Sequence, residues 1–123
     1  MKKILVVDDD CWILDACKQM LQFKNYGVNT ASDVKEAKKQ LEQENFHMVI
    51  SDINLPGETG MDLLRHIRQK FPDTGVIMMS GNPDISEGEC RREGACYYLH
   101  KPFDLNQFLS KVDAFFSKET IKK

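Results

Sequence analysis

The chain has 123 residues, of which 41% are hydrophobic and 29% are charged, and its net charge is −2. This length and composition predict one globular domain and leave no room for a second hydrophobic core. The weakly acidic balance gives no field that attracts nucleic acid or anionic lipid, so we expect this chain to bind neither directly.

The amino-terminal apolar stretch is too short for a signal peptide or a membrane span. It covers only residues 4–7 and is followed at once by three aspartates, residues 8–10. We therefore expect a cytoplasmic protein without a membrane segment. The four cysteines form no CxxC pair, so they indicate neither zinc nor a disulfide, and we expect Cys11 and Cys17 to be small buried residues.

Apolar runs of strand length alternate with segments that have the apolar spacing of helices. The predicted strands cover residues 3–7, 28–31, 48–52, 76–79 and 97–100. The predicted helices cover residues 12–23, a segment capped by Asp33 and Glu36, a segment from Thr59 or Gly60 to Phe71, residues 85–93, and residues 105–116. The fourth of these helices contains Gly88 and few apolar residues, so its sequence supports a helix only weakly.

Five alternations of strand and helix predict an α/β fold with a parallel, doubly wound sheet. For five strands we expect the order 2-1-3-4-5, the flavodoxin-like (βα)5 arrangement, in which the first and third strands are neighbours. The predicted domain spans residues 1–117, and residues 118–123 are a polar tail or the start of a linker.

Acidic residues follow the first and third strands at the edge where such sheets bind ligands. Asp8 and Asp9 follow the first strand, and Asp52 ends the third. Several carboxylates in one crevice repel each other unless they hold protons or a cation. Oxygen ligands without histidine or thiolate favour Mg²⁺ or Mn²⁺, so we expect a magnesium site here.

Two further strand ends supply a hydroxyl and a positive charge. Ser80 follows the fourth strand, and Lys101 follows the fifth. Together with a carboxylate and a divalent cation, these groups are what phosphoryl transfer requires, with Asp52 as the residue that becomes an aspartyl phosphate.

Four motifs in this order resemble the receiver domain of two-component response regulators. They are Asp8-Asp9, Asp52 followed by Leu55-Pro56 and Gly60, Ser80-Gly81, and Lys101-Pro102-Phe103. The resemblance covers nearly the whole chain. It implies a phosphoacceptor domain, rather than an ordinary enzyme, that takes a phosphoryl group from a histidine kinase or a phosphotransfer protein in a reaction that requires Mg²⁺.

The resemblance also implies a role for each residue of the acceptor site. Asp52 matches the phosphoacceptor, Asp8 and Asp9 match the acidic pair that binds metal, and the position of Asn54 supplies a backbone carbonyl to the same ion. Asn54 and Asn82 stand at positions that influence the lifetime of the phosphoryl group in the family.

Further roles concern the response to phosphorylation. Ser80 resembles the switch hydroxyl, Tyr98 the aromatic ring that swings inward, and Lys101 the lysine that pairs with the phosphoryl group, with a cis bond to Pro102. The resemblance implies that the fourth helix, fifth strand and fifth helix form the output surface. A phosphorylation-dependent homodimer and an output domain beyond residue 123 are both compatible with it.

Other readings of these residues stay open. Asp8 and Asp9 could only cap the first helix, as we expect of Asp10. The chain could be an interaction module with a receiver fold and no phosphorylation, or an aspartyl-phosphate phosphatase. The phosphatase is disfavoured because Asn54 stands where such an enzyme needs a second acid. Trp12 fits a core position and a rim position equally well.

Overall fold

The structure is a computed structural model that describes residues 2–81 and 87–121, with side chains of the last helix described as far as Ser117. The strands are β1 (Lys3–Val7), β2 (Gly27–Ala31), β3 (Met48–Asp52), β4 (Gly75–Ser80) and β5 (Tyr97–His100). The helices are α1 (Cys11–Phe23), α2 (Val34–Gln43), α3 (Gly60–Lys70), α4 (Glu87–Arg92) and α5 (Leu105–Ile121).

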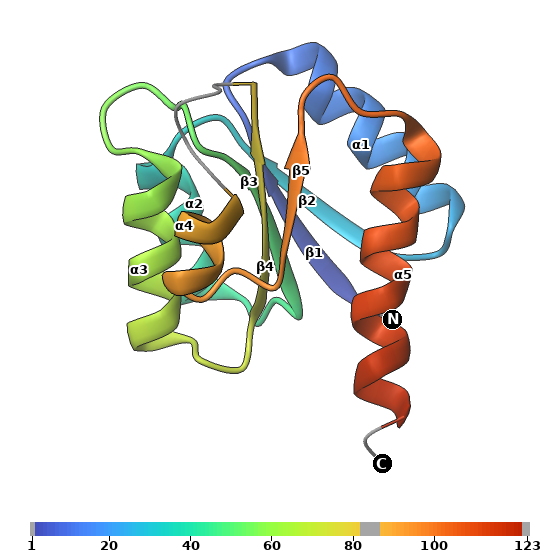
Figure 1. Cartoon of the computed structure of the whole chain (residues 1–123). Helices are drawn as coiled ribbons and strands as arrows, with labels where there is room; N and C mark the ends of the chain where they lie inside the picture. Colours follow the sequence, from blue (N-terminus) through green and yellow to red (C-terminus); the bar gives the residue numbers. More distant parts are fainter. Residues whose placement is uncertain (1, 82–86, 122–123) are drawn as a thin grey trace.

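The five strands form one parallel sheet in the order β2-β1-β3-β4-β5, which confirms the predicted fold class and strand order. Helices cover both faces of the sheet (Figure 1). α1 and α5 lie on one face, and α2, α3 and α4 lie on the other. β1 and β3 are neighbours, so the residues that follow them meet at the carboxyl edge of the sheet.

Alternating side chains divide the core into two layers. In β1, Ile4 and Val6 pack on the side of α1 and α5, whereas Leu5 and Val7 pack on the side of α2, α3 and α4. All four are fully buried. The apolar run of β1 is unbroken because helices cover this strand on both faces.

Side-chain caps fix the helix starts that follow the first two strands. Asp10 Oδ1 accepts a hydrogen bond from the Trp12 amide at 2.9 Å, as predicted for this residue. Asp33 Oδ1 accepts one from the Glu36 amide at 2.8 Å, which confirms the predicted cap of α2. These caps therefore end the loops that follow β1 and β2.

The structure differs from the prediction at the carboxyl terminus. α5 continues to Ile121, so residues 118–121, predicted as a polar tail or linker, are helical. No glycine or proline interrupts residues 105–121, and polar residues on an exposed helix face do not stop a helix. The domain boundary at residue 117 stays a prediction. α4 lies within the predicted residues 85–93, of which 85 and 86 lie outside the described residues, as does Asn82.

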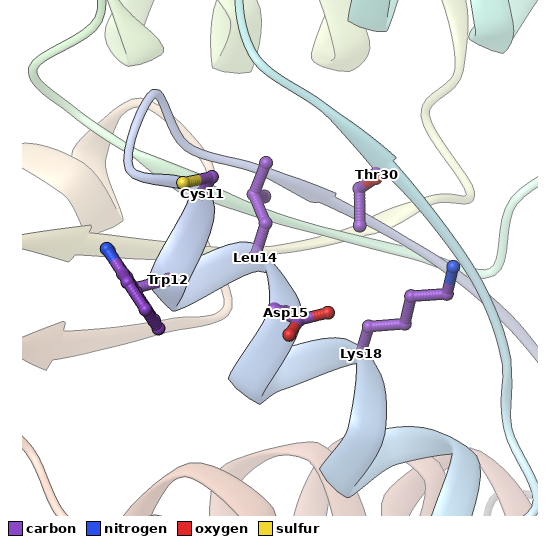
Figure 2. A pocket seen from close by; sticks show the side chains of 6 residues that line it. All are labelled: Cys11, Trp12, Leu14, Asp15, Lys18 and Thr30. Atoms are coloured by element: carbon purple, nitrogen blue, oxygen red, sulfur yellow. The ribbon is translucent and has the colours of Figure 1, made fainter.

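At the start of α1 one expectation was wrong and one open alternative is decided. Cys11 is exposed rather than buried, and Trp12 is 81% exposed, which excludes a core position. Both belong to the first turn of α1 (Figure 2). The core-facing side of this helix consists instead of the partly buried Ile13 and Leu14 and the buried Cys17 and Leu21. None of the described helices has the length and apolar character that crossing a membrane requires.

Candidate functional site

Three aspartates meet at the carboxyl edge, as the sequence predicts. Asp8 follows β1 and is fully buried, Asp52 ends β3 and is 6% exposed, and Asp9 is exposed. One carboxylate oxygen of each lies within 4.8 Å of the others. Among the described residues this is the group of acidic, histidine or cysteine side chains that is suited to hold a metal ion.

Lys101 bridges the two buried carboxylates. Its Nζ atom lies 2.8 Å from Asp8 Oδ2 and 3.1 Å from Asp52 Oδ2. Burial disfavours the charged ammonium, but the hydrogen bonds and charges of Asp8 and Asp52 outweigh this effect and raise the pKa of Lys101. Burial also raises the pKa of Asp8, although Lys101 and the Asp10 amide act in the opposite direction. The site therefore holds a lysine cation between closely spaced carboxylates.

Each buried carboxylate also accepts one backbone hydrogen bond. The Asp10 amide donates to Asp8 Oδ1 at 3.0 Å, and the Asn54 amide donates to Asp52 Oδ1 at 3.2 Å. The remaining oxygen of each carboxylate faces Lys101. Both carboxylates are thus held in fixed orientations by the loops that follow β1 and β3.

The other predicted residues lie around this centre. Ser80 ends β4 and is fully buried, and its carbonyl accepts the Lys101 amide at 2.8 Å. The Lys101–Pro102 bond is cis, as the resemblance implied. The Asn54 side chain is exposed. Tyr98 is half-buried on the α2, α3 and α4 side of the sheet.

The sequence named two neighbours of the site without predicting their contact with it. Gly60 opens α3, and a Cβ atom at this position would lie 2.1 Å from the Asp52 carbonyl oxygen, so only glycine allows α3 to start this close to the acceptor strand. Cys17 of α1 is buried, and burial together with the Asp8 charge raises its pKa to about 12. The sequence signal for Gly60 was its fixed place in the motif, whereas Cys17 carried only a core pattern.

The donor set fits a hard divalent cation. Asp8, Asp9 and Asp52 offer carboxylate oxygens from two adjacent loops, and two of these residues are buried beside a single lysine. Carboxylates this close together are stabilised by further positive charge. The arrangement can therefore hold such an ion next to a fixed carboxylate that is available as a nucleophile.

Comparisons with known proteins agree with this geometry. A family model described as the response regulator receiver domain matches residues 4–113. The response regulator MprA of Mycolicibacterium vanbaalenii is 29% identical over 119 residues, which are 96% of this chain and 52% of MprA. The chain thus spans about half the length of this relative.

Solved structures give the same result. A CheY-like response regulator receiver domain protein from Methanospirillum hungatei is 32% identical with a TM-score of 0.92, and the match covers 100% of this chain and 99% of that one. The response regulator TrrA of Thermotoga maritima, solved in complex with Mg²⁺–BeF, is 32% identical with a TM-score of 0.84. That match covers 93% of this chain and 98% of TrrA.

Proposed function

Because the chain belongs to the response regulator receiver domain family, we propose that Asp52 accepts a phosphoryl group from a phosphohistidine of a histidine kinase or a phosphotransfer protein. A carboxylate oxygen of Asp52 forms the new bond to phosphorus, the bond from phosphorus to the imidazole nitrogen breaks, and its electron pair stays on the imidazole. The observation that carries this proposal is the fixed, buried Asp52 carboxylate beside Asp8, Asp9 and Lys101.

A magnesium ion, for which manganese could substitute, belongs to this proposal. Asp8, Asp9, Asp52 and the backbone carbonyl of Asn54 would hold it, and the carboxylate set described above fits such an ion. When bound, it supplies positive charge to the phosphoryl oxygens. The structure of the related response regulator TrrA, solved in complex with Mg²⁺–BeF, supports a magnesium ion in this proposal.

Lys101 also takes part in the proposed reaction. Its ammonium lies between Asp8 and Asp52. When Asp52 carries a phosphoryl group, the ammonium can form an ion pair with the negative charge of that group. Ser80 would turn its hydroxyl toward that group, and Tyr98 would respond by moving inward. Phosphorylation would thus shift an equilibrium between two surface states.

The proposed output surface consists of α4, β5 and α5. A phosphorylation-dependent homodimer through this surface is part of the proposal. An output domain beyond residue 123 is also part of it, and is supported by the relative MprA, which is about twice as long as this chain. We further propose that the chain acts in the cytoplasm as a phosphoacceptor and not as an enzyme with a separate substrate.

The intact mass of the protein after incubation with acetyl phosphate tests the proposal. We expect a gain of one phosphoryl group that requires Mg²⁺ and is lost in Asp52→Asn. Asp73→Asn, at the opposite edge of the sheet, is the control and should gain the group normally. A gain that survives in Asp52→Asn would assign the acceptor elsewhere. No gain together with no Mg²⁺ binding would favour the interaction module.

A further inference from the structure

β3 carries a buried hydroxyl directly before the acceptor residue. Ser51 is 1% exposed and follows Met48, Val49 and Ile50, which are all fully buried. The alternation of side chains along the strand places Ser51 with Val49, in the core layer shared with α2, α3 and α4. A hydroxyl in an apolar layer is costly unless it forms a hydrogen bond. Ser51 meets this condition, because its Oγ atom donates to the Asp52 carbonyl oxygen at 2.9 Å.

This hydrogen bond lies where one strand pairing ends. β1 and β3 are paired as far as Val7 and Ser51, one residue short of Asp52. The pairing of β3 with β4 includes Asp52, and the Ile53 amide donates to the Met79 carbonyl at 2.9 Å. The peptide group that joins Asp52 to Ile53 is therefore held at its N–H by β4 and at its carbonyl by Ser51.

The same contact restrains the backbone of the acceptor residue. The ring that it closes contains ψ of Ser51 and both φ and ψ of Asp52, and these torsions set the direction of the Asp52 side chain. Gly60 also limits the movement of this carbonyl, since even a Cβ atom there would lie 2.1 Å from it. The direction matters because Asp52 Oδ1 accepts the Asn54 amide at 3.2 Å and Oδ2 lies 3.1 Å from Lys101 Nζ.

We propose that Ser51 is a positioning residue, which orients the Asp52 carboxylate for phosphoryl transfer by holding the Asp52 carbonyl. This inference rests on the proposed function of Asp52 as the phosphoacceptor. Ser51 acts through the backbone, so it affects the rate by keeping the nucleophilic oxygen in the attack geometry. A serine that only provides a small side chain for packing predicts a different result, because alanine would then replace it without loss.

Removal of the hydroxyl tests the proposal, since Ser51→Ala keeps nearly the same side-chain volume. At saturating Mg²⁺, its phosphorylation by acetyl phosphate, followed by intact mass, should be roughly tenfold slower than in the original protein. Thr74→Val is the matched control. Thr74 is also buried, and its hydroxyl donates to the Phe46 carbonyl at 3.0 Å, at the opposite edge of the sheet. Both variants should lower the melting temperature by about 4 °C, but only Ser51→Ala should slow phosphorylation.

Amide hydrogen exchange gives a measurement that does not depend on phosphorylation. The Gly60 amide donates to the Ile53 carbonyl at 2.8 Å, so Gly60 and Ile53 both belong to the segment that Ser51 restrains. In Ser51→Ala, these two amides should exchange at least about threefold faster than in Thr74→Val. The comparison between the two variants removes the effect of a lower global stability, because both lose one buried hydrogen bond of the same kind.

A second substitution keeps the test independent of the behaviour of alanine at this position. The thiol of Ser51→Cys is a weaker donor of similar size, so this variant should be phosphorylated at a rate between those of Ser51→Ala and the original protein. A rate no higher than that of Ser51→Ala would overturn the role of the donor.

The outcomes separate the positioning role from the proposed function. Equal phosphorylation rates in Ser51→Ala and the original protein would overturn the positioning role, and so would equal slowing in Ser51→Ala and Thr74→Val. If the original protein gains no phosphoryl group, the proposed function fails instead. Amide exchange then decides the role of Ser51, since unchanged exchange at Ile53 and Gly60 would show that its hydroxyl does not hold this peptide group.

Discussion

Lys101 Nζ lies 2.8 Å from Asp8 Oδ2, which joins the loop after β5 to the loop after β1 at the centre of the acceptor site. The same nitrogen reaches Asp52 at 3.1 Å. Asp8 is fully buried, whereas the lysine side chain is 20% exposed, so the cation approaches the carboxylates from the solvent side. In the absence of a metal ion, stability and acceptor geometry should therefore depend on this lysine.

Lys101→Met should lower the free energy of unfolding by roughly 2 kcal/mol without divalent cations, because it leaves Asp8 and Asp52 with no paired cation. Urea unfolding followed by circular dichroism measures this change. Mg²⁺ should restore part of the loss, since it supplies positive charge to the same oxygens. Lys39→Met removes an exposed lysine of α2 and should change stability by less than about 0.5 kcal/mol. Equal effects of the two variants would contradict the structural role of the bridge.

Asp9→Asn should weaken Mg²⁺ binding by at least about tenfold, because Asp9 offers one of the three carboxylates of the site. The fold should be retained, since Asp9 is exposed. Isothermal titration calorimetry gives the affinity, and the Mg²⁺-dependent rise in melting temperature gives an independent measure. Asp73→Asn, in a loop at the opposite edge of the sheet, should bind Mg²⁺ as the original protein does. Unchanged affinity in Asp9→Asn would remove this residue from the metal site.

Gly60→Ala should destabilise the protein by about 3 kcal/mol, because the new methyl group would lie 2.1 Å from the Asp52 carbonyl oxygen and 2.8 Å from Ile53 Cα. Backbone atoms cannot move aside without displacing Asp52, so phosphorylation should also slow. Gly81→Ala is the matched control, since its methyl group meets Lys101 Cβ at an ordinary 3.7 Å. Denaturant midpoints of both variants, measured side by side, decide whether the close approach at Gly60 is real.

Tyr26 provides a prediction about pH. Its hydroxyl donates to Asp113 Oδ1 at 2.9 Å, and burial, this hydrogen bond and the Asp113 charge raise its pKa to about 12. The folded chain thus keeps the phenol proton above the pH at which the unfolded chain loses it. The stability that Tyr26 contributes is present below pH 10 and is lost as the pH rises toward about 12.

Tyr26→Phe should reduce stability by about 1 kcal/mol at neutral pH and flatten the alkaline loss. Ultraviolet titration of phenolate in the original protein and in Tyr26→Phe isolates the ionisation of this residue. A Tyr26 pKa near 10 would show that the Asp113 hydrogen bond is absent in solution.

The sequence was sufficient for the fold and for the convergence of Asp8, Asp9 and Asp52 at one edge of the sheet. Each buried strand, such as residues 3–7, is apolar on both faces, and this pattern together with the alternation of elements predicts the sheet order. Once the order is known, Asp8 and Asp52 have to meet, because they end neighbouring strands. Local patterns carry this information, since side-chain periodicity and helix caps depend on residues that are close in the chain.

Two other features were left open by the sequence. The polar composition of residues 118–121 permits a helix as well as a tail, so the sequence alone did not fix the end of α5 at Ile121. The position of Trp12 beside the acidic loop left its exposure open in the same way.

The sequence by itself therefore determined which elements form, in which order they pair and which carboxylates converge. Only the tertiary structure decided that Lys101 joins Asp8 to Asp52 and that Gly60 must lack a side chain. The physical reason is that hydrogen bonding and steric exclusion act over a few ångströms, between atoms whose separation is set by the packing of the whole domain.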